Sequence, residues 1–212
     1  MEKLETIVEE IRSEFEAKNA VRDTALQRSR TLIRYCANAI RAAHRGDWAE
    51  GEELLNTARL AARELVADLD SYPDLFYAGY TQDALKEYVE AEVVHAFIRG
   101  GSLPTPGDLG VESAAYLKGL AEAASELRRQ SLDLMRHNRL DRAEEMLAIM
   151  DEVYSQLMTV GFPDAITAGL RRTTDMLRGV VHRTRGDLTT ALRQEMMRQA
   201  LIEFEERIGM EA

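Results

Sequence analysis

The sequence has one cysteine, four prolines and few aromatic side chains among its 212 residues. The single cysteine, Cys36, excludes an intrachain disulfide and a zinc site built from cysteines, and it suits a reducing compartment. No run reaches the roughly 18 uncharged apolar residues that a membrane span requires, and the start lacks the apolar core of a secretion signal. We therefore expect a soluble protein of the cytoplasm.

Positive charge is also scarce. The chain carries 27 basic and 37 acidic residues, for a formal net charge of −10. Binding to a nucleic-acid backbone depends on clustered lysine and arginine, so this balance counts against an open, strongly basic groove.

Few prolines and glycines leave few points at which a long helix must end. Apolar residues recur at helical spacing through most of the chain, and no alternating, β-branched stretch predicts a strand. We expect one all-α domain over residues 1–212, a bundle of seven to eight helices. Prolines at positions 73, 104, 106 and 163 separate helical segments, and Gly186 with Asp187 separates the last two. The expected helices cover about 2–18, 23–45, 47–69, 81–99, 112–137, 138–158, 162–185 and 187–208.

The first expected helix carries an apolar stripe on an otherwise acidic segment. The stripe consists of Leu4, Ile7, Val8, Ile11 and Phe15. We expect this segment to be an outer helix in contact with solvent.

The motifs of common catalytic sites are missing: there is no glycine-rich phosphate loop, no zinc-protease helix and no nucleophile elbow. Any chemistry must therefore depend on carboxylates. The helix expected at 81–99 is apolar almost all round in its second half, which indicates an inner helix, and it carries Glu87 and Glu90 about 60° apart. Two half-buried carboxylates need protonation, basic partners or a cation. A divalent metal and ion pairing with a neighbouring helix both remain open.

The helix expected at 112–137 carries a second pair of carboxylates, Glu122 and Glu126, one turn apart. They could form a solvated face paired with Lys118 and Arg129. However, Ala115, Gly119 and Ala123 run beside them at four-residue spacing and would allow another helix to approach closely. The two pairs could then face each other, and four carboxylates form a hard-oxygen site suited to Mg²⁺ or Mn²⁺.

Two other interpretations use different residues. Glu92 and His95 have the Glu-x-x-His spacing of di-iron bundles, but the motif occurs once where such bundles use two copies. A weak repeat at an offset of 92 residues, Glu52–Leu55 against Glu144–Leu147, is compatible with a helical-hairpin adaptor protein, although such arrays need a shorter period and more copies.

Two separated motifs resemble the translin/TRAX family. The run Leu85-Lys86-Glu87-Tyr88-Val89-Glu90-Ala91, followed by His95-Ala96-Phe97-Ile98, is similar to a TRAX helix. The runs Tyr116-Leu117-Lys118-Gly119-Leu120-Ala121-Glu122 and Ser125-Glu126-Leu127-Arg128-Arg129 are similar to the family's second signature helix. The resemblance covers about residues 22–186 and leaves the two ends of the chain outside it.

The resemblance implies a translin-like α-superhelical fold and a hollow homo-oligomer, an octamer, that binds RNA or single-stranded DNA inside. TRAX-type subunits are Mg²⁺-dependent endoribonucleases, and their metal-binding and catalytic carboxylates fall on Glu87, Glu90, Glu122 and Glu126. Glu122 stands where TRAX has Asp, which keeps the charge but adds a methylene. Translin subunits bind nucleic acid without a complete acidic site, so a non-catalytic cage is the alternative.

Arginines are the candidate phosphate-binding residues: Arg30, Arg34, Arg41 and Arg129. Salt bridges between these arginines and the abundant glutamates are an equally good interpretation. A closed cage can be acidic outside and basic inside, so the net charge describes the outer surface. Nucleic-acid binding by this chain therefore depends on enclosure and on metal.

Overall fold

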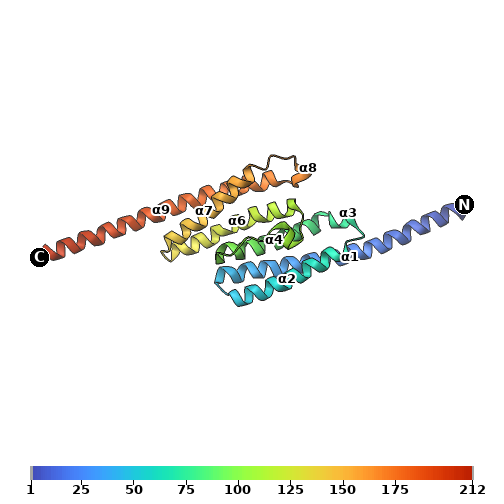
Figure 1. Ribbon diagram of the computed structural model, residues 1–212, viewed down its shortest axis with the longest axis horizontal. Coiled ribbons are helices and arrows are strands. Elements are labelled where there is room, and N and C mark those ends of the chain that lie inside the picture. The colour runs from blue at the N-terminus through green and yellow to red at the C-terminus, as the bar shows by residue number, and fades with distance from the viewer. Residues whose placement is uncertain (1, 212) are drawn as a thin grey trace. The chain divides into compact units, whose positions relative to one another are not determined.

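The computed structural model describes residues 2–211, and the side chains of residues 3–209. Within that range the chain forms nine helices and no strand, which confirms the all-α prediction (Figure 1). In chain order they are α1 (Glu2–Arg45), α2 (Trp48–Asp68), α3 (Pro73–Phe76), α4 (Gly79–Arg99), α5 (Pro106–Leu109), α6 (Ser113–Arg136), α7 (Leu140–Met158), α8 (Asp164–Thr167) and α9 (Leu170–Glu211).

The chain divides into two compact units. The first contains the residues up to Ala96 together with Ser102–Gly119, and the second contains Phe97–Gly101 together with the residues from Leu120 onward. The long helices α4 and α6 each cross from one unit to the other without a break.

The first unit is built on an antiparallel hairpin of α1 and α2 (Figure 1). Gly46 makes the turn with φ +73°, a conformation that favours glycine. Asp47 then caps α2 by accepting a hydrogen bond from the backbone N–H of Glu50 at 3.2 Å. Leu32 of α1 and Leu55 of α2 are completely buried.

The second unit contains α7 packed against α9, and α8 packed against the start of α9. Met146 and Met150 of α7 and Leu177 of α9 are buried in its core. The segment predicted as one helix over 162–185 is divided here, because Ala168 and Gly169, which lie between α8 and α9, have φ values of +49° and +83°.

Two predicted helix breaks are wrong. The segments expected at 2–18 and 23–45 form the single 44-residue helix α1, because residues 19–22 contain neither glycine nor proline. Gly186 lies inside α9, which runs for 42 residues. A lone glycine costs a helix about 1 kcal/mol relative to alanine, which lowers its stability without ending it.

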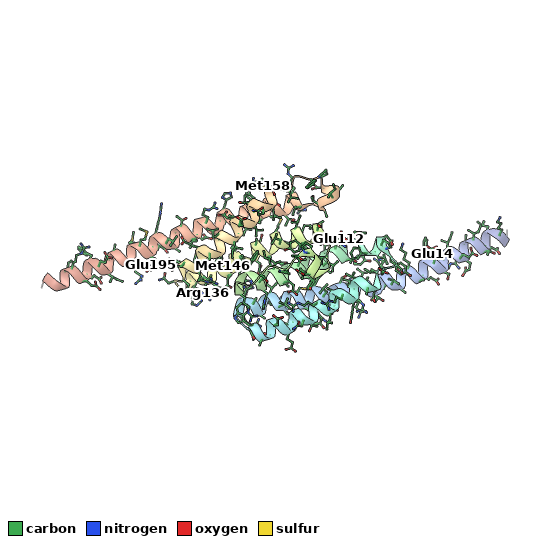
Figure 2. The ribbon with its side chains drawn as sticks, viewed as in Figure 1. Glu14, Glu112, Arg136, Met146, Met158 and Glu195 are labelled. Atoms are coloured by element: carbon green, nitrogen blue, oxygen red, sulfur yellow. The ribbon has the colours of Figure 1, made fainter. Side chains whose placement is uncertain are left out.

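Both ends of the chain are long exposed helices. The side chains of residues 3–17 in α1 are all exposed, as predicted for an outer helix, and so are those of residues 196–209 in α9. Figure 2 labels Glu14 on the first of these segments and Glu195 directly before the second. Among the described residues, none of the helices is both long and apolar enough to cross a membrane.

Candidate metal and nucleic-acid site

Helix α4 is an inner helix, as its composition predicts. Leu85, Val89, Val93 and Val94 have no exposed surface. Glu87 and Glu90 lie on this helix and are half-buried. The backbone of α4 therefore holds two carboxylates three residues apart at the margin of a core, where water screens their repulsion poorly.

Lysine is the basic partner that the structure gives to the first of these carboxylates. The Lys86 ammonium lies 2.9 Å from Glu87 Oε1, and the Lys86 side chain is only 12% exposed. One turn earlier, Lys118 of α6 lies 3.9 Å from Asp83 of α4. Ion pairs with Lys86 and Lys118 thus neutralise part of the negative charge on α4. Ion pairing is the alternative to a metal that the sequence left open.

The carboxylates of α4 also act on a buried thiol of α1. Burial raises the pKa of Cys36 well above its usual range, and the charges of Glu87, Glu92 and Glu90 raise it further. Cys36 is completely buried, and it is a free, protonated thiol. A hard divalent cation is the kind of ligand that carboxylate oxygens such as those of Glu87 and Glu90 suit.

Gly119 brings α6 directly against α4. A Cβ atom at Gly119 would lie 2.7 Å from the backbone oxygen of Lys86 and 2.7 Å from the Cβ of Val89. Real Cβ atoms do not occur at such distances, so only glycine fits there. Ala115 and Ala123, one turn to either side, are buried. The prediction that small residues allow a close helix approach is confirmed at Gly119.

Glu122 and Glu126 follow on the same unbroken helix, about one and two turns after Gly119. Both belong to the second unit, and both are half-buried. They are therefore less solvated than a face pointing outward, and Lys118, a predicted partner for them, pairs with Asp83. Further along α6, Arg128 pairs with Asp187 of α9 at 2.8 Å.

Both side chains of the Glu-x-x-His pair contact residues of α2. Arg59 of α2 donates to both oxygens of Glu92, at 2.7 and 2.8 Å, and the Glu92 side chain is 7% exposed. Because two hydrogen bonds from Arg59 engage this carboxylate, it is a poor metal ligand. His95 is also 7% exposed, and its ring meets Trp48 edge-on with centroids 5.4 Å apart. These contacts argue against di-iron chemistry.

The predicted phosphate-binding arginines are exposed. Arg30, Arg34 and Arg41 lie on α1 in the first unit, and Arg129 lies on α6 in the second. Among the described residues, none of these four guanidinium groups forms an ion pair with a carboxylate. Arg41 donates to Asn38 at 2.9 Å, and the Arg34 guanidinium lies 5.9 Å from the centre of the Tyr35 ring.

A fourth arginine of α1, Arg45, lies on the same face of the helix as three of these residues. Arg30, Arg34, Arg41 and Arg45 are separated by four, seven and four residues, which places them on one face of α1. Arg45 pairs with Glu50 and was not among the predicted residues. The signal was present in the sequence, because residues 24–46 contain five arginines and no Asp or Glu in a chain of 37 acidic residues. We call Arg30, Arg34, Arg41 and Arg45 the α1 arginine row.

Comparisons with known proteins agree with this fold. No family model matches the chain. The uncharacterized protein MJ0175 of Methanocaldococcus jannaschii is 30% identical over 186 residues, which cover 87% of this chain and 82% of that protein. The crystal structure of AfC3PO, from Archaeoglobus, is 32% identical with a TM-score of 0.82, and the match covers 89% of this chain and 98% of that one.

Two further structures extend the comparison. AfC3PO in complex with duplex RNA matches with a TM-score of 0.77 over the same shares of both chains. Apo-NeC3PO, from Nematostella, is only 19% identical but has a TM-score of 0.79, which shows a shared fold. The molecule is thus an all-α protein with paired carboxylates on closely packed helices. The chain belongs to the translin/TRAX family.

Proposed function

We propose that this protein is a metal-dependent endoribonuclease of the TRAX type, which binds RNA or single-stranded DNA as a hollow homo-oligomer. The observation that carries the proposal is the contact at Gly119. It packs α6 against α4 beside Glu87 and Glu90, and α6 then continues to Glu122 and Glu126. The sequence similarity to AfC3PO supports the same assignment.

In this proposal Glu87, Glu90, Glu122 and Glu126 bind Mg²⁺ or Mn²⁺. All four side chains are half-buried carboxylates, and oxygen donors of this kind are the ligands that hard divalent cations prefer. When bound, the cation would polarise a phosphate and lower the pKa of an attacking water.

The α1 arginine row and Arg129 would contact the phosphates of the substrate. Their guanidinium groups are exposed, and arginine binds phosphate with two parallel hydrogen bonds. RNA is the substrate class we infer, since AfC3PO has been crystallised with duplex RNA. Comparing single-stranded with duplex RNA of one sequence would show which form this chain prefers.

Cleavage of RNA by the purified protein tests the catalytic assignment. We expect cleavage with Mg²⁺, none with EDTA, and at least a hundredfold loss in Glu87→Gln. Glu112→Gln is the matched control, because Glu112 is an exposed glutamate just outside α6. Undiminished cleavage by Glu87→Gln, together with a normal circular dichroism spectrum, would remove Glu87 from the site.

A non-catalytic, translin-like binding protein is the second candidate, and Lys86 favours it. A lysine 2.9 Å from Glu87 offers a way to neutralise a carboxylate without metal. The two candidates differ in a simple measurement. Tight RNA binding with no cleavage in Mg²⁺ or Mn²⁺, and no metal uptake by calorimetry, would select the binding protein.

The assembly is the last part of the proposal. An octamer would have a mass eight times 23.9 kDa, whereas a helical-hairpin adaptor would have the mass of one or two chains. Light scattering on the purified protein separates them. We also propose a cytoplasmic location, because the one cysteine is a buried free thiol, as a reducing compartment favours.

A further inference from the structure

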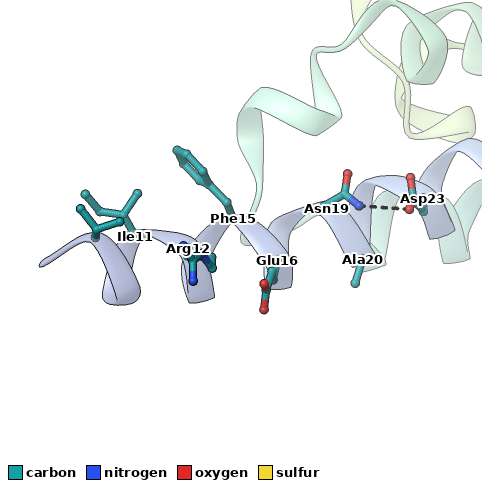
Figure 3. Close-up of a pocket in the computed structure, with 8 residues that line it drawn as sticks. Ile11, Arg12, Phe15, Glu16, Asn19, Ala20 and Asp23 are labelled. Carbon is teal, nitrogen blue, oxygen red and sulfur yellow. Dashed lines mark hydrogen bonds between the residues drawn. The ribbon is translucent and has the colours of Figure 1, made fainter. Parts of the chain in front are cut away.

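The exposed first part of α1 carries an apolar seam that none of the described side chains covers. Leu4, Val8, Ile11 and Phe15 are 61%, 46%, 44% and 64% exposed, and every side chain of residues 3–17 is exposed. Figure 3 shows Ile11 and Phe15 projecting from one side of α1 and Glu16 from the other. An acidic, solvated helix gains nothing from such a seam unless another helix packs on it.

The spacing of the seam is that of a coiled coil. Its residues are separated by four, three and four positions, so they occupy the alternating d and a positions of two heptads. Glu5 and Arg12 then occupy the two e positions, which flank the seam. The face opposite the seam is polar, with Glu9, Glu10 and Glu16.

We propose that this segment, residues 3–17, pairs antiparallel with the same segment of a second copy of the chain. In that arrangement Leu4 packs against Phe15 of the partner subunit, and Val8 packs against Ile11 of the partner subunit. Each large residue then meets a smaller one. The same surface is used on both chains, as a two-fold interface requires.

The charges at the two e positions favour the antiparallel pairing. In an antiparallel coiled coil the e positions of the two helices face each other. Glu5 therefore faces Arg12 of the partner subunit, and the two-fold axis produces the same pair a second time. In a single chain Arg12 contacts Glu9 at 2.9 Å with both side chains more than half exposed, so it can bridge to a second carboxylate.

The other exposed helix end is a poor partner for the seam. The tail of α9 has its own seam with the same spacing, formed by Met197, Leu201, Phe204 and Ile208. Its e positions are Arg198 and Glu205. A fully overlapped antiparallel pairing with α1 would place Glu5 opposite Glu205 and Arg12 opposite Arg198. Like charges in these positions disfavour that complex, which leaves a second α1 as the partner.

Charge exchange tests the interface in the full-length protein. Glu5→Arg and Arg12→Glu each place like charges opposite each other twice, so we expect each variant to self-associate about tenfold more weakly in sedimentation experiments. An equimolar mixture of the two variants, and the double variant, should both regain the association of the wild type. Glu10→Arg makes the same change in charge away from the seam and should have no effect. Equal association of both single variants and the wild type would overturn the proposal.

Disulfide trapping tests the orientation. Val8→Cys and Ile11→Cys, mixed and oxidised, should give a crosslinked dimer containing one chain of each kind. Each variant alone should crosslink poorly, and Cys36 does not interfere because it is buried. Crosslinking of Val8→Cys with itself in preference to the mixture would mean parallel helices and would refute the antiparallel pairing.

This inference rests on the homo-oligomer of the proposed function. The experiments distinguish a wrong interface from the absence of an oligomer. An oligomer that forms no mixed crosslink keeps the proposed assembly and removes this interface. A chain that is monomeric in light scattering contradicts both. Residues 3–17 lie outside the buried core, so these substitutions should leave the helix content by circular dichroism unchanged.

Discussion

Gly119 sets the distance between two helices through the absence of a side chain. Replacing it with alanine would force a Cβ atom to within 2.7 Å of backbone and Cβ atoms of α4, so α6 must shift. We expect Gly119→Ala to lower the free energy of unfolding by about 1–3 kcal/mol, the usual cost of overpacking a core. Urea denaturation followed by circular dichroism measures this change.

Gly186 is the matched control for that substitution. It is also a glycine inside a long helix, but a Cβ atom there would meet nothing within 4 Å. Gly186→Ala should therefore raise the free energy of unfolding by about 0.5–1 kcal/mol through helix propensity. Similar effects of the two substitutions would show that Gly119 is not confined by α4.

The glutamates of α4 show how far sequence reasoning reaches at a single residue. Helical spacing identifies Glu87 and Glu90 as carboxylates at the edge of an inner helix, and the structure agrees. The role of Glu92 could not be predicted, because its partner Arg59 lies 33 positions away on α2. Lys86 was missed for a different reason: an adjacent lysine ordinarily points away from its neighbour on a helix.

At the scale of helices, composition and periodicity predict the fold better than they predict helix ends. Helices α2, α4, α6 and α7 begin and end within two residues of the predicted positions. The errors are two breaks that do not occur, at residues 19–22 and at Gly186, and one break at Ala168 and Gly169 that was not predicted. Polar residues or a single glycine weaken a helix, but packing along its length decides whether it continues.

The α1 arginine row is an element-scale feature, since it depends on one uninterrupted helix. About 6 Å separates Arg30 from Arg34 along the helix axis, and the row continues to Arg45. We expect Arg30→Ala with Arg34→Ala to weaken binding of single-stranded RNA. The slope of log K against log salt should fall by about 1.4, since each lost phosphate contact contributes about 0.7.

An arginine elsewhere controls for loss of charge alone. Arg142 is an exposed residue of α7 that pairs with Glu145, so Arg142→Ala changes the net charge without touching α1. It should leave the RNA affinity and its salt dependence unchanged in fluorescence anisotropy titrations. Equal salt slopes for the wild type and the α1 variant would show that the row does not contact phosphates.

For the whole molecule, the net charge of −10 hides an uneven distribution. Residues 24–46 are free of acidic side chains, while the exposed first part of α1 and the tail of α9 are rich in glutamate. Acidic outer segments and a local basic row can coexist in one chain. A negative total charge therefore does not exclude nucleic-acid binding, provided that the substrate meets the basic row.

Metal binding at the four-carboxylate site should stabilise the whole molecule. A cation that binds only the folded chain adds about 2.7 kcal/mol at a concentration of 100 times its Kd, or about 5–10 °C in Tm for a chain of this length. Mg²⁺ should therefore raise the Tm of the wild type, and EDTA should reverse the effect. In Glu87→Gln with Glu90→Gln, Mg²⁺ should no longer change the Tm, because two of the four carboxylate ligands are gone. Glu112→Gln should respond to Mg²⁺ like the wild type. A Tm that does not depend on Mg²⁺ or Mn²⁺ in the wild type would contradict the metal site whatever the protein does to RNA.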